Sequence, residues 1–185
     1  MKIYVTGLGV ISGIGIGVSE NIEALKQKRH GIGKVTLFPT ALDVPVSEVK
    51  CDNEKLKQLL SLSPLQTVSR TALLGMMAAK EALEDAGLPM QGTRNASQQQ
   101  PLRIGFISAT SVGGMDLSEH FYEAFKQDPS RGRLREVISH DCGASTELIA
   151  SYLGIRDFVT TISTACSSAA NAVMLGARMI RHGQL

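Results

Sequence analysis

The sequence predicts an α/β protein in which a mixed β-sheet is flanked by α-helices. Three apolar runs rich in β-branched residues, at 2–10, 103–108 and 158–163, are typical of strands. Apolar residues recur at three- and four-residue spacings over 169–180, as on one face of a helix, and a similar apolar stripe lies in the long helix before the second run. The expected order is strand, helix, irregular stretch, helix, strand, helices, strand, helix, and such alternation is typical of α/β folds.

The chain is expected to begin with a strand and a helix. The apolar run Lys2–Val10 indicates a strand buried on both faces rather than a secretion signal. Ser19 can cap a helix that continues to Leu25, because a serine hydroxyl accepts a hydrogen bond from the first turn.

The middle of the chain is expected to contain loops and the longest helix. Prolines interrupt 31–62, which predicts mostly loop with a short helix over 54–60. Ser63-Pro64 then opens the longest helix, since proline is favoured at the first helical position, and Gly87 with the following proline ends it. The polar segment 91–101 has no apolar pattern and predicts an exposed site of proteolytic cleavage. The apolar stripe of the long helix consists of Leu73, Met76, Ala79 and Leu83.

The second strand leads into a loop of small residues at 109–114, which lets the backbone approach a neighbour closely. Helices are expected over 116–125 and 145–153, and Gly154 supplies the left-handed residue that ends the second of them. The third strand and a last helix, 169–180, complete the chain, with Gly183 as the terminating glycine.

Cys166 lies where the third strand turns into this last helix. A thiol at a helix N-terminus is favoured as the thiolate, which attacks carbonyl carbons, by the macrodipole and by unpaired backbone N–H groups. The arrangement is analogous to the nucleophile elbow of hydrolases, in which the nucleophile occupies a strained strand-to-helix turn. Cys166 is therefore the candidate nucleophile, although spacing alone is equally compatible with a buried structural cysteine.

The segment Thr164–Ala169 resembles the active-site segment of the β-ketoacyl-acyl carrier protein synthases, the condensing enzymes of the thiolase superfamily. Three further segments match that family in order. Residues 5–12 resemble its first strand and turn, 81–88 the end of its long N-terminal helix, and Gly113-Gly114 the glycine pair after its second strand. The resemblance implies that 1–185 is the N-terminal half of a thiolase-like fold.

The resemblance implies a synthase II-like enzyme of fatty acid, polyketide or polyene synthesis. Cys166 would accept an acyl group from the phosphopantetheine of acyl carrier protein, and a malonyl-acyl carrier protein would then lose carbon dioxide and condense with it. Val112, Gly113 and Gly114 would lie beside the acyl pocket, with Val112 helping to set the acyl length. A homodimer is implied, since family members pair the last strand with its twin, and no cofactor or metal is expected.

Family members also use two histidines from the C-terminal half of a chain roughly twice as long. Of the four histidines in this chain, His182 closes the helix of the nucleophile. It lies about 24 Å of helix rise from Cys166 and cannot substitute. We therefore expect an N-terminal half that cannot elongate acyl chains by itself.

Two other functions stay open at this stage. The chain could belong to another thiolase-superfamily acyltransferase that uses coenzyme A thioesters, although the four ordered matches are more similar to the carrier-protein branch. It could also be a non-catalytic partner akin to the chain-length factors, which generally lack the nucleophilic cysteine, so the presence of Cys166 speaks against that function.

Other motifs have simpler explanations. The glycines of Gly7–Gly15 suggest a dinucleotide loop, but Ser12 stands where the third glycine is needed, which favours a structural turn. His140-Asp141-Cys142 is typical of a solvated loop, because adjacent residues rarely converge on one metal ion. The basic cluster Arg131–Arg135 predicts a solvated face, which could meet an acidic helix of acyl carrier protein.

The composition fits a globular domain with a substantial core. The 185 residues are 43% hydrophobic with a net charge of +2, which gives no reason to expect nucleic-acid or anionic-membrane binding. No apolar run approaches the roughly 18 residues of a membrane span. Three cysteines, an odd number, argue against a complete disulfide framework and favour a reducing, cytoplasmic compartment.

Overall fold

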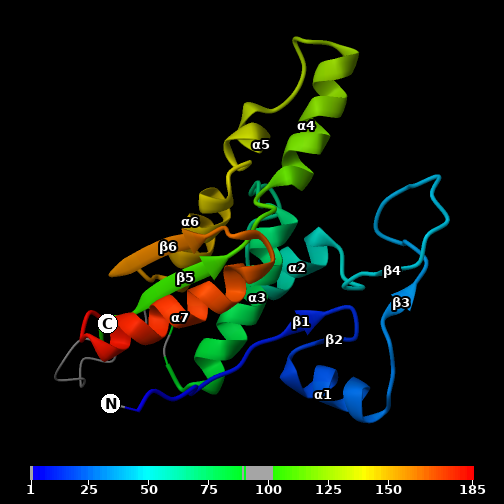
Figure 1. Cartoon of the computed structure of the whole chain (residues 1–185). Coiled ribbons are helices and arrows are strands. Elements are labelled where there is room, and N and C mark those ends of the chain that lie inside the picture. The colour runs from blue at the N-terminus through cyan, green and yellow to red at the C-terminus, as the bar shows by residue number, and fades with distance from the viewer. Residues whose placement is uncertain (1, 89, 91–101) are drawn as a thin grey trace. The chain divides into compact units, whose positions relative to one another are not determined.

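The computed structural model describes residues 2–88, 90 and 102–185 (Figure 1). The chain divides into two compact units. The first contains Met1–Val5, Leu65–Met76 and Pro89–Leu185, and the second contains Thr6–Pro64 and Met77–Leu88. The expected cleavage segment, 91–101, lies outside the described residues.

The first unit is built on two parallel strands, β5 (Gly105–Ala109) and β6 (Phe158–Ile162). Their register runs from Gly105 opposite Phe158 to Ala109 opposite Ile162. Helices α6 (Cys142–Leu153) and α7 (Ser168–Arg181) both contact this pair of strands, and Figure 1 shows α7 alongside β5. The expected α/β architecture is therefore present, with β6 within one residue of its predicted bounds and β5 beginning two residues later than predicted.

The core of the first unit lies where α6 meets helix α3 (Arg70–Asp85). A Cβ on Gly75 of α3 would meet the Cδ1 atom of Ile149 at 2.5 Å, so the Ile149 side chain of α6 packs directly on this glycine. Burying one leucine, isoleucine or methionine side chain stabilises a fold by about 1.5–3 kcal/mol, so this cluster supplies a large favourable contribution. The buried apolar side chains of α3 and α6 are Ala72, Leu73, Met76, Ile149, Ala150 and Leu153.

Two helices between the strands pack against each other. These are α4 (Met115–Gln127) and α5 (Leu134–Ile138), and the Nδ1 atom of His120 lies 3.1 Å from the Oε1 atom of the buried Glu136. Helix α5 was not expected, because Arg133 and Arg135 suggested only a solvated face. The segment that contains the apolar residues Leu134, Val137 and Ile138 is long enough for only about one and a half turns of helix.

The predicted helix ends are confirmed where glycine supplies them. Gly87, Gly154 and Gly183 follow α3, α6 and α7 with φ angles of 66°, 72° and 66°, a backbone conformation that other residues adopt only at a cost.

The second unit contains short elements joined by long loops. Helix α2 (Asn53–Leu59) is capped by Asp52, whose side chain accepts a hydrogen bond from the Lys55 backbone N–H at 2.7 Å. The strands pair in two antiparallel sets, β1 with β2 and β3 with β4. The elements are β1 (Ile11–Ser12), β2 (Gly15–Ile16), α1 (Val18–Lys26), β3 (Ile32–Gly33), β4 (Val46–Ser47) and α2 (Asn53–Leu59).

The prediction of a doubly buried first strand is wrong. Lys2–Val10 forms no strand, and the side chains of Tyr4 and Val5 are 72% and 81% exposed. An apolar run has the same appearance in sequence whether it pairs in a sheet or lies along a helix, so the pattern could not separate these outcomes.

The part of this run that belongs to the second unit lies against α3. A Cβ on Gly9 would meet the Ala78 carbonyl oxygen at 1.9 Å, so only glycine permits this approach. The backbone N–H of Leu8 donates to the Asp85 carboxylate, and that of Val10 donates to Glu81, each at 2.9 Å. These N–H groups are bound to helix side chains and are not available to a neighbouring strand. The glycines serve close packing, as the structural interpretation of Gly7–Gly15 expected.

Two predicted helix starts are also wrong. Helix α1 begins at Val18 after Gly17, so Ser19 is not its cap; the Val18 N–H donates instead to the Glu81 side chain at 2.7 Å. The longest helix begins at Arg70 rather than at Ser63-Pro64.

The start of α3 is fixed by groups that come from elsewhere in the first unit. The hydroxyl of the fully buried Ser69 accepts from the Ala72 N–H at 3.2 Å, and Asp116 of α4 accepts from the Arg70 N–H at 2.8 Å. Ser69 is therefore the capping serine, and the contact with Asp116 selects it over the earlier serine and proline.

Candidate active site

Cys166 lies on a sharp turn between β6 and α7. The strand ends at Ile162, a 3₁₀ turn (η1) spans Ala165–Ser167, and α7 begins at Ser168. The thiol is exposed. The predicted strand, turn and helix are therefore confirmed, with the cysteine in the 3₁₀ turn that immediately precedes the helix.

The residue before the cysteine has a strained backbone. Ala165 has a φ angle of 50°, in the left-handed region that residues other than glycine rarely adopt. This conformation costs roughly 1–2 kcal/mol for a residue with a Cβ atom. Strain of this kind persists only where surrounding groups hold it, and it is common at functional sites.

Ser168 holds the strained turn from within α7. Its Oγ atom accepts a hydrogen bond from the Thr164 N–H and donates one to the Ala165 carbonyl oxygen, each at 2.8 Å. The residue is only 5% exposed. One buried hydroxyl thus binds two backbone groups of the turn, and the Ala165 carbonyl oxygen also accepts from the Ser168 backbone N–H.

A second set of contacts holds the start of the turn. The Asn171 Nδ2 atom donates to the Thr164 Oγ1 atom at 2.9 Å and to the Ser167 Oγ atom at 3.2 Å. The Ser167 hydroxyl also donates to the Thr164 carbonyl oxygen at 2.8 Å. Both ends of the 3₁₀ turn are therefore tied to the first turns of α7.

Sequence reasoning missed these supporting residues. No role in the site was predicted from the sequence for Ser167, Ser168 or Asn171. The available signal was their polarity, because serine and asparagine near a helix start often bond to the backbone.

The glycine loop after β5 packs against another turn. Gly113 and Gly114 are buried, and a Cβ on Gly114 would meet the Ser139 carbonyl oxygen at 1.9 Å. Gly113 has a φ angle of 60°, and its own Cβ would meet the His140 carbonyl oxygen at 2.4 Å. The expected close approach of backbone is confirmed, and the partner is the segment before α6. Val112, by contrast, is 53% exposed.

The glycine loop that follows β5 and the turn that carries Cys166 both begin at the carboxyl ends of the paired strands β5 and β6. Ala109 and Ile162 are opposite each other at the carboxyl ends of β5 and β6, and the Thr110 N–H donates to the Ile162 carbonyl oxygen at 3.3 Å. Val112–Gly114 and Cys166 follow these ends within a few residues. Ligands of α/β proteins bind at the carboxyl ends of parallel strands, so this edge is the candidate site.

The other sequence candidates form no second site. His140 bonds through Nδ1 to the Ser118 hydroxyl at 2.9 Å. Within 2–88, 90 and 102–185, no group of three or more histidine, cysteine, aspartate or glutamate residues could hold a metal ion. Cys142 and Cys166 are free thiols, and Cys51 is buried.

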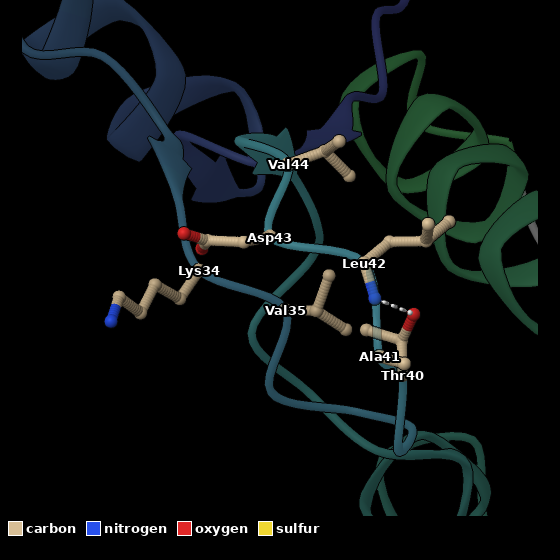
Figure 2. A pocket seen from close by; sticks show the side chains of 7 residues that line it. All are labelled: Lys34, Val35, Thr40, Ala41, Leu42, Asp43 and Val44. Carbon is tan, nitrogen blue, oxygen red and sulfur yellow. Dashed lines mark hydrogen bonds between the residues drawn. The ribbon is translucent and has the colours of Figure 1, made fainter.

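A pocket in the second unit lies on the loop between β3 and β4 (Figure 2). It is lined by Lys34, Val35 and 40–44, and the Leu42 N–H donates to the Thr40 hydroxyl at 3.1 Å. None of these residues was a candidate for function.

In the part of the chain that is described, the helices are too short or too polar to cross a membrane.

The chain matches the family model of the beta-ketoacyl synthase N-terminal domain over residues 1–185, and it belongs to that family. It is 28% identical over 190 residues to the 3-oxoacyl-[acyl-carrier-protein] synthase 2 of Coxiella burnetii, covering 98% of this chain and 42% of the relative. It is 26% identical over 190 residues to the tetracenomycin polyketide synthase ketoacyl synthase alpha subunit of Streptomyces glaucescens, covering 99% and 43%.

The fold is similar to that of the ishigamide ketosynthase/chain length factor. The two superpose with a TM-score of 0.83 at 26% identity, over 98% of this chain and 44% of that one. The expected fold, the N-terminal half of a thiolase-like fold, is thereby confirmed. The chain spans less than half the length of the proteins that it matches.

Proposed function

We propose that this chain supplies the acyl-accepting nucleophile, Cys166, of a 3-oxoacyl-acyl carrier protein synthase. One observation carries the proposal: an exposed thiol stands on a strained strand-to-helix turn in a chain of the beta-ketoacyl synthase family. Such a turn presents a nucleophile to an incoming carbonyl carbon without burying it under the preceding strand.

The first half-reaction follows from the chemistry of a thiolate. The Cys166 sulfur attacks the thioester carbonyl carbon of an acyl-phosphopantetheine, a new sulfur–carbon bond forms, and the bond to the phosphopantetheine sulfur breaks. The departing thiolate takes up the proton that the cysteine lost. The product is an acyl thioester on Cys166 and a free carrier thiol.

The second half-reaction is a decarboxylative condensation. A malonyl thioester loses carbon dioxide, and the resulting carbanion attacks the acyl group on Cys166, forming a carbon–carbon bond and releasing the cysteine sulfur. By resemblance, this step uses two histidines that follow the matched segment in the family. The chain described here therefore contributes acyl acceptance.

The same proposal assigns the remaining parts of the site. Val112, Gly113 and Gly114 line the acyl pocket, which is supported by their position at the same strand edge as Cys166. Acyl carrier protein is the proposed donor, supported by the name of the Coxiella relative. A cytoplasmic homodimer is the proposed state, supported by the free thiols of Cys142 and Cys166 and by the family resemblance.

The test is direct acylation. The purified chain is incubated with octanoyl-acyl carrier protein or octanoyl-coenzyme A, digested with trypsin, and analysed by mass spectrometry. Cys166 and Cys142 fall in separate peptides, 157–178 and 136–156, so the modified thiol is identified unambiguously. We expect one octanoyl group on Cys166 from the carrier protein.

Two variants, one that removes the proposed nucleophile and one matched control, identify the thiol that is acylated. Cys166→Ala should abolish acylation, and Cys142→Ala, the matched control, should leave it unchanged. Octanoylation from coenzyme A at an equal or higher rate would favour a coenzyme A-dependent acyltransferase. No octanoylation of Cys166 from either donor would contradict the proposed role of the thiol.

A further inference from the structure

We propose that Ser168 is a positioning residue for the Cys166 thiol, because its hydroxyl holds the backbone of Thr164 and Ala165 in the turn that presents the sulfur. The inference deepens the function proposed above and rests on it only for its consequence in acyl transfer. The claim that Ser168 controls the position of the Cys166 thiol does not depend on the proposed function and can be tested on this chain by itself.

The geometry of the Ser168 hydroxyl is specific. A serine hydroxyl has one proton to donate and lone pairs to accept with. Here the Oγ atom accepts from the Thr164 N–H and donates to the Ala165 carbonyl oxygen, each at 2.8 Å, and the residue is 5% exposed. Water can therefore replace neither contact easily if the hydroxyl is removed.

These two contacts act on the strained residue. The φ angle of Ala165 is 50°, and the Ser168 hydroxyl binds the carbonyl group of Ala165 itself and the N–H group of the preceding residue, Thr164. Without the hydroxyl, Ala165 can relax to an ordinary backbone conformation, which rotates the following peptide unit. Since Cys166 is the next residue, that rotation moves its side chain.

The effect should stay local. Thr164 and Ser167 remain tied to Asn171, which bonds to both side chains. The start of α7 is thus held by a second, independent set of hydrogen bonds when Ser168 loses its hydroxyl. A change in Cys166 reactivity can therefore be observed in a folded protein.

The experiment compares the rates at which two thiols of one molecule react with iodoacetamide. Tryptic peptides 157–178 and 136–156 report Cys166 and Cys142 separately, so Cys142 is an internal reference. The variants are Ser168→Ala and the pair Ser168→Thr and Ser168→Val, which differ only in the hydroxyl. Ser145→Ala is the control, since Ser145 is also buried but lies in α6, where its Oγ atom is 3.4 Å from that of Ser69.

We expect Ser168→Ala to lower the Cys166 to Cys142 rate ratio about 3- to 10-fold, the range that corresponds to the loss of one net hydrogen bond. Ser168→Thr should return the ratio to within about twofold of the unmodified chain, while Ser168→Val should not, and Ser145→Ala should leave it unchanged. An unchanged ratio in Ser168→Ala overturns the proposal, as does an equal fall in Ser145→Ala. Should Ser168→Ala fail to fold, equal ratios in the Thr and Val variants overturn it.

Acylation with octanoyl N-acetylcysteamine supplies the second measurement. Ser168→Ala should lower the limiting rate constant for acylation of Cys166 and leave the half-saturating donor concentration unchanged, because the donor contacts are intact. If the unmodified chain is not acylated but the alkylation ratio still falls in Ser168→Ala, the positioning role stands and the proposed function fails. If the unmodified chain is acylated and neither rate changes in Ser168→Ala, the function stands and the positioning role fails.

Discussion

Gly114 provides the sharpest test of the candidate site, because it lies in the loop beside the strand edge and tolerates no side chain. A Cβ added there would meet the Ser139 carbonyl oxygen at 1.9 Å and its carbon at 2.8 Å. Real Cβ contacts keep at least 3.0 Å, so the two backbone segments would have to separate by more than 1 Å. That movement would break the 3.1 Å hydrogen bond from the Gly114 N–H to the His140 carbonyl oxygen.

The magnitude follows from these two losses. Overpacking of this kind costs about 1–3 kcal/mol, and the lost backbone hydrogen bond costs about 1 kcal/mol more. Gly114→Ala should therefore lower the free energy of unfolding by about 2–4 kcal/mol. For a chain of this size that corresponds to a fall in Tm of about 4–16 °C.

Thermal unfolding followed by circular dichroism measures this change. Gly143→Ala is the matched control, since that glycine lies in α6 and an added Cβ would have no atom within 4 Å. Its Tm should stay the same or rise slightly, because alanine favours helix. A Gly114→Ala variant that melts within 2 °C of the unmodified chain, by roughly the conversion used above, would refute the packing argument.

Three further predictions concern other parts of the chain. Hydrogen bonds from the Lys50 side chain and from Thr36 lower the pKa of Glu48 from 4.5 to about 2. A carboxyl group with a lowered pKa in the folded state stabilises the protein at pH values above its unfolded-state pKa, and this stabilisation is lost as the carboxylate is protonated. The Tm should therefore fall as the pH is lowered from 4.5 to about 2, and it should fall less steeply in Glu48→Gln. Glu81→Ala removes the acceptor of the Val10 and Val18 N–H groups. Amide hydrogen exchange at both residues should become about tenfold faster, since a hydrogen bond to a carboxylate is worth about 1.5 kcal/mol or more. Glu84→Ala is the control and should not change exchange at either residue, because the Glu84 carboxylate lies 3.9 Å from the Lys80 Nζ atom and does not bind these N–H groups. Finally, the 185-residue chain should accept an acyl group but release no elongated product from malonyl-acyl carrier protein in a radioactive incorporation assay, and measured elongation would contradict the division of labour proposed above.

Local patterns predicted the region around Cys166 well. The β-branched run before it and the small apolar residues after it each specify their own backbone conformation, so β6 and α7 appear within one or two residues of the expected positions. Gly87, Gly154 and Gly183 ended helices as predicted, because their freedom to adopt positive φ is a property of the residue itself.

The N-terminal apolar run shows where local patterns no longer predict the structure. Apolar residues in Lys2–Val10 indicated a buried strand, yet the backbone N–H groups of Leu8 and Val10 bond to carboxylates of α3, more than seventy positions along the chain. The start of α3 shows the same limitation. Ser63-Pro64 and Ser69 are both acceptable helix starts, and a carboxylate from α4 decides between them.

The sequence by itself determined the family, the strand-to-helix turn and the thiol placed on it, because short runs of residues encode each of these. Only the tertiary structure decided which groups hold that turn, since Ser168 and Asn171 act through hydrogen bonds to a backbone whose conformation no propensity specifies. It also decided what the glycine pair packs against, because the Ser139 and His140 carbonyl groups that meet Gly113 and Gly114 come from a separate turn between α5 and α6. Patterns in a sequence describe what one segment prefers, and contacts between distant segments depend on how all of them fold together.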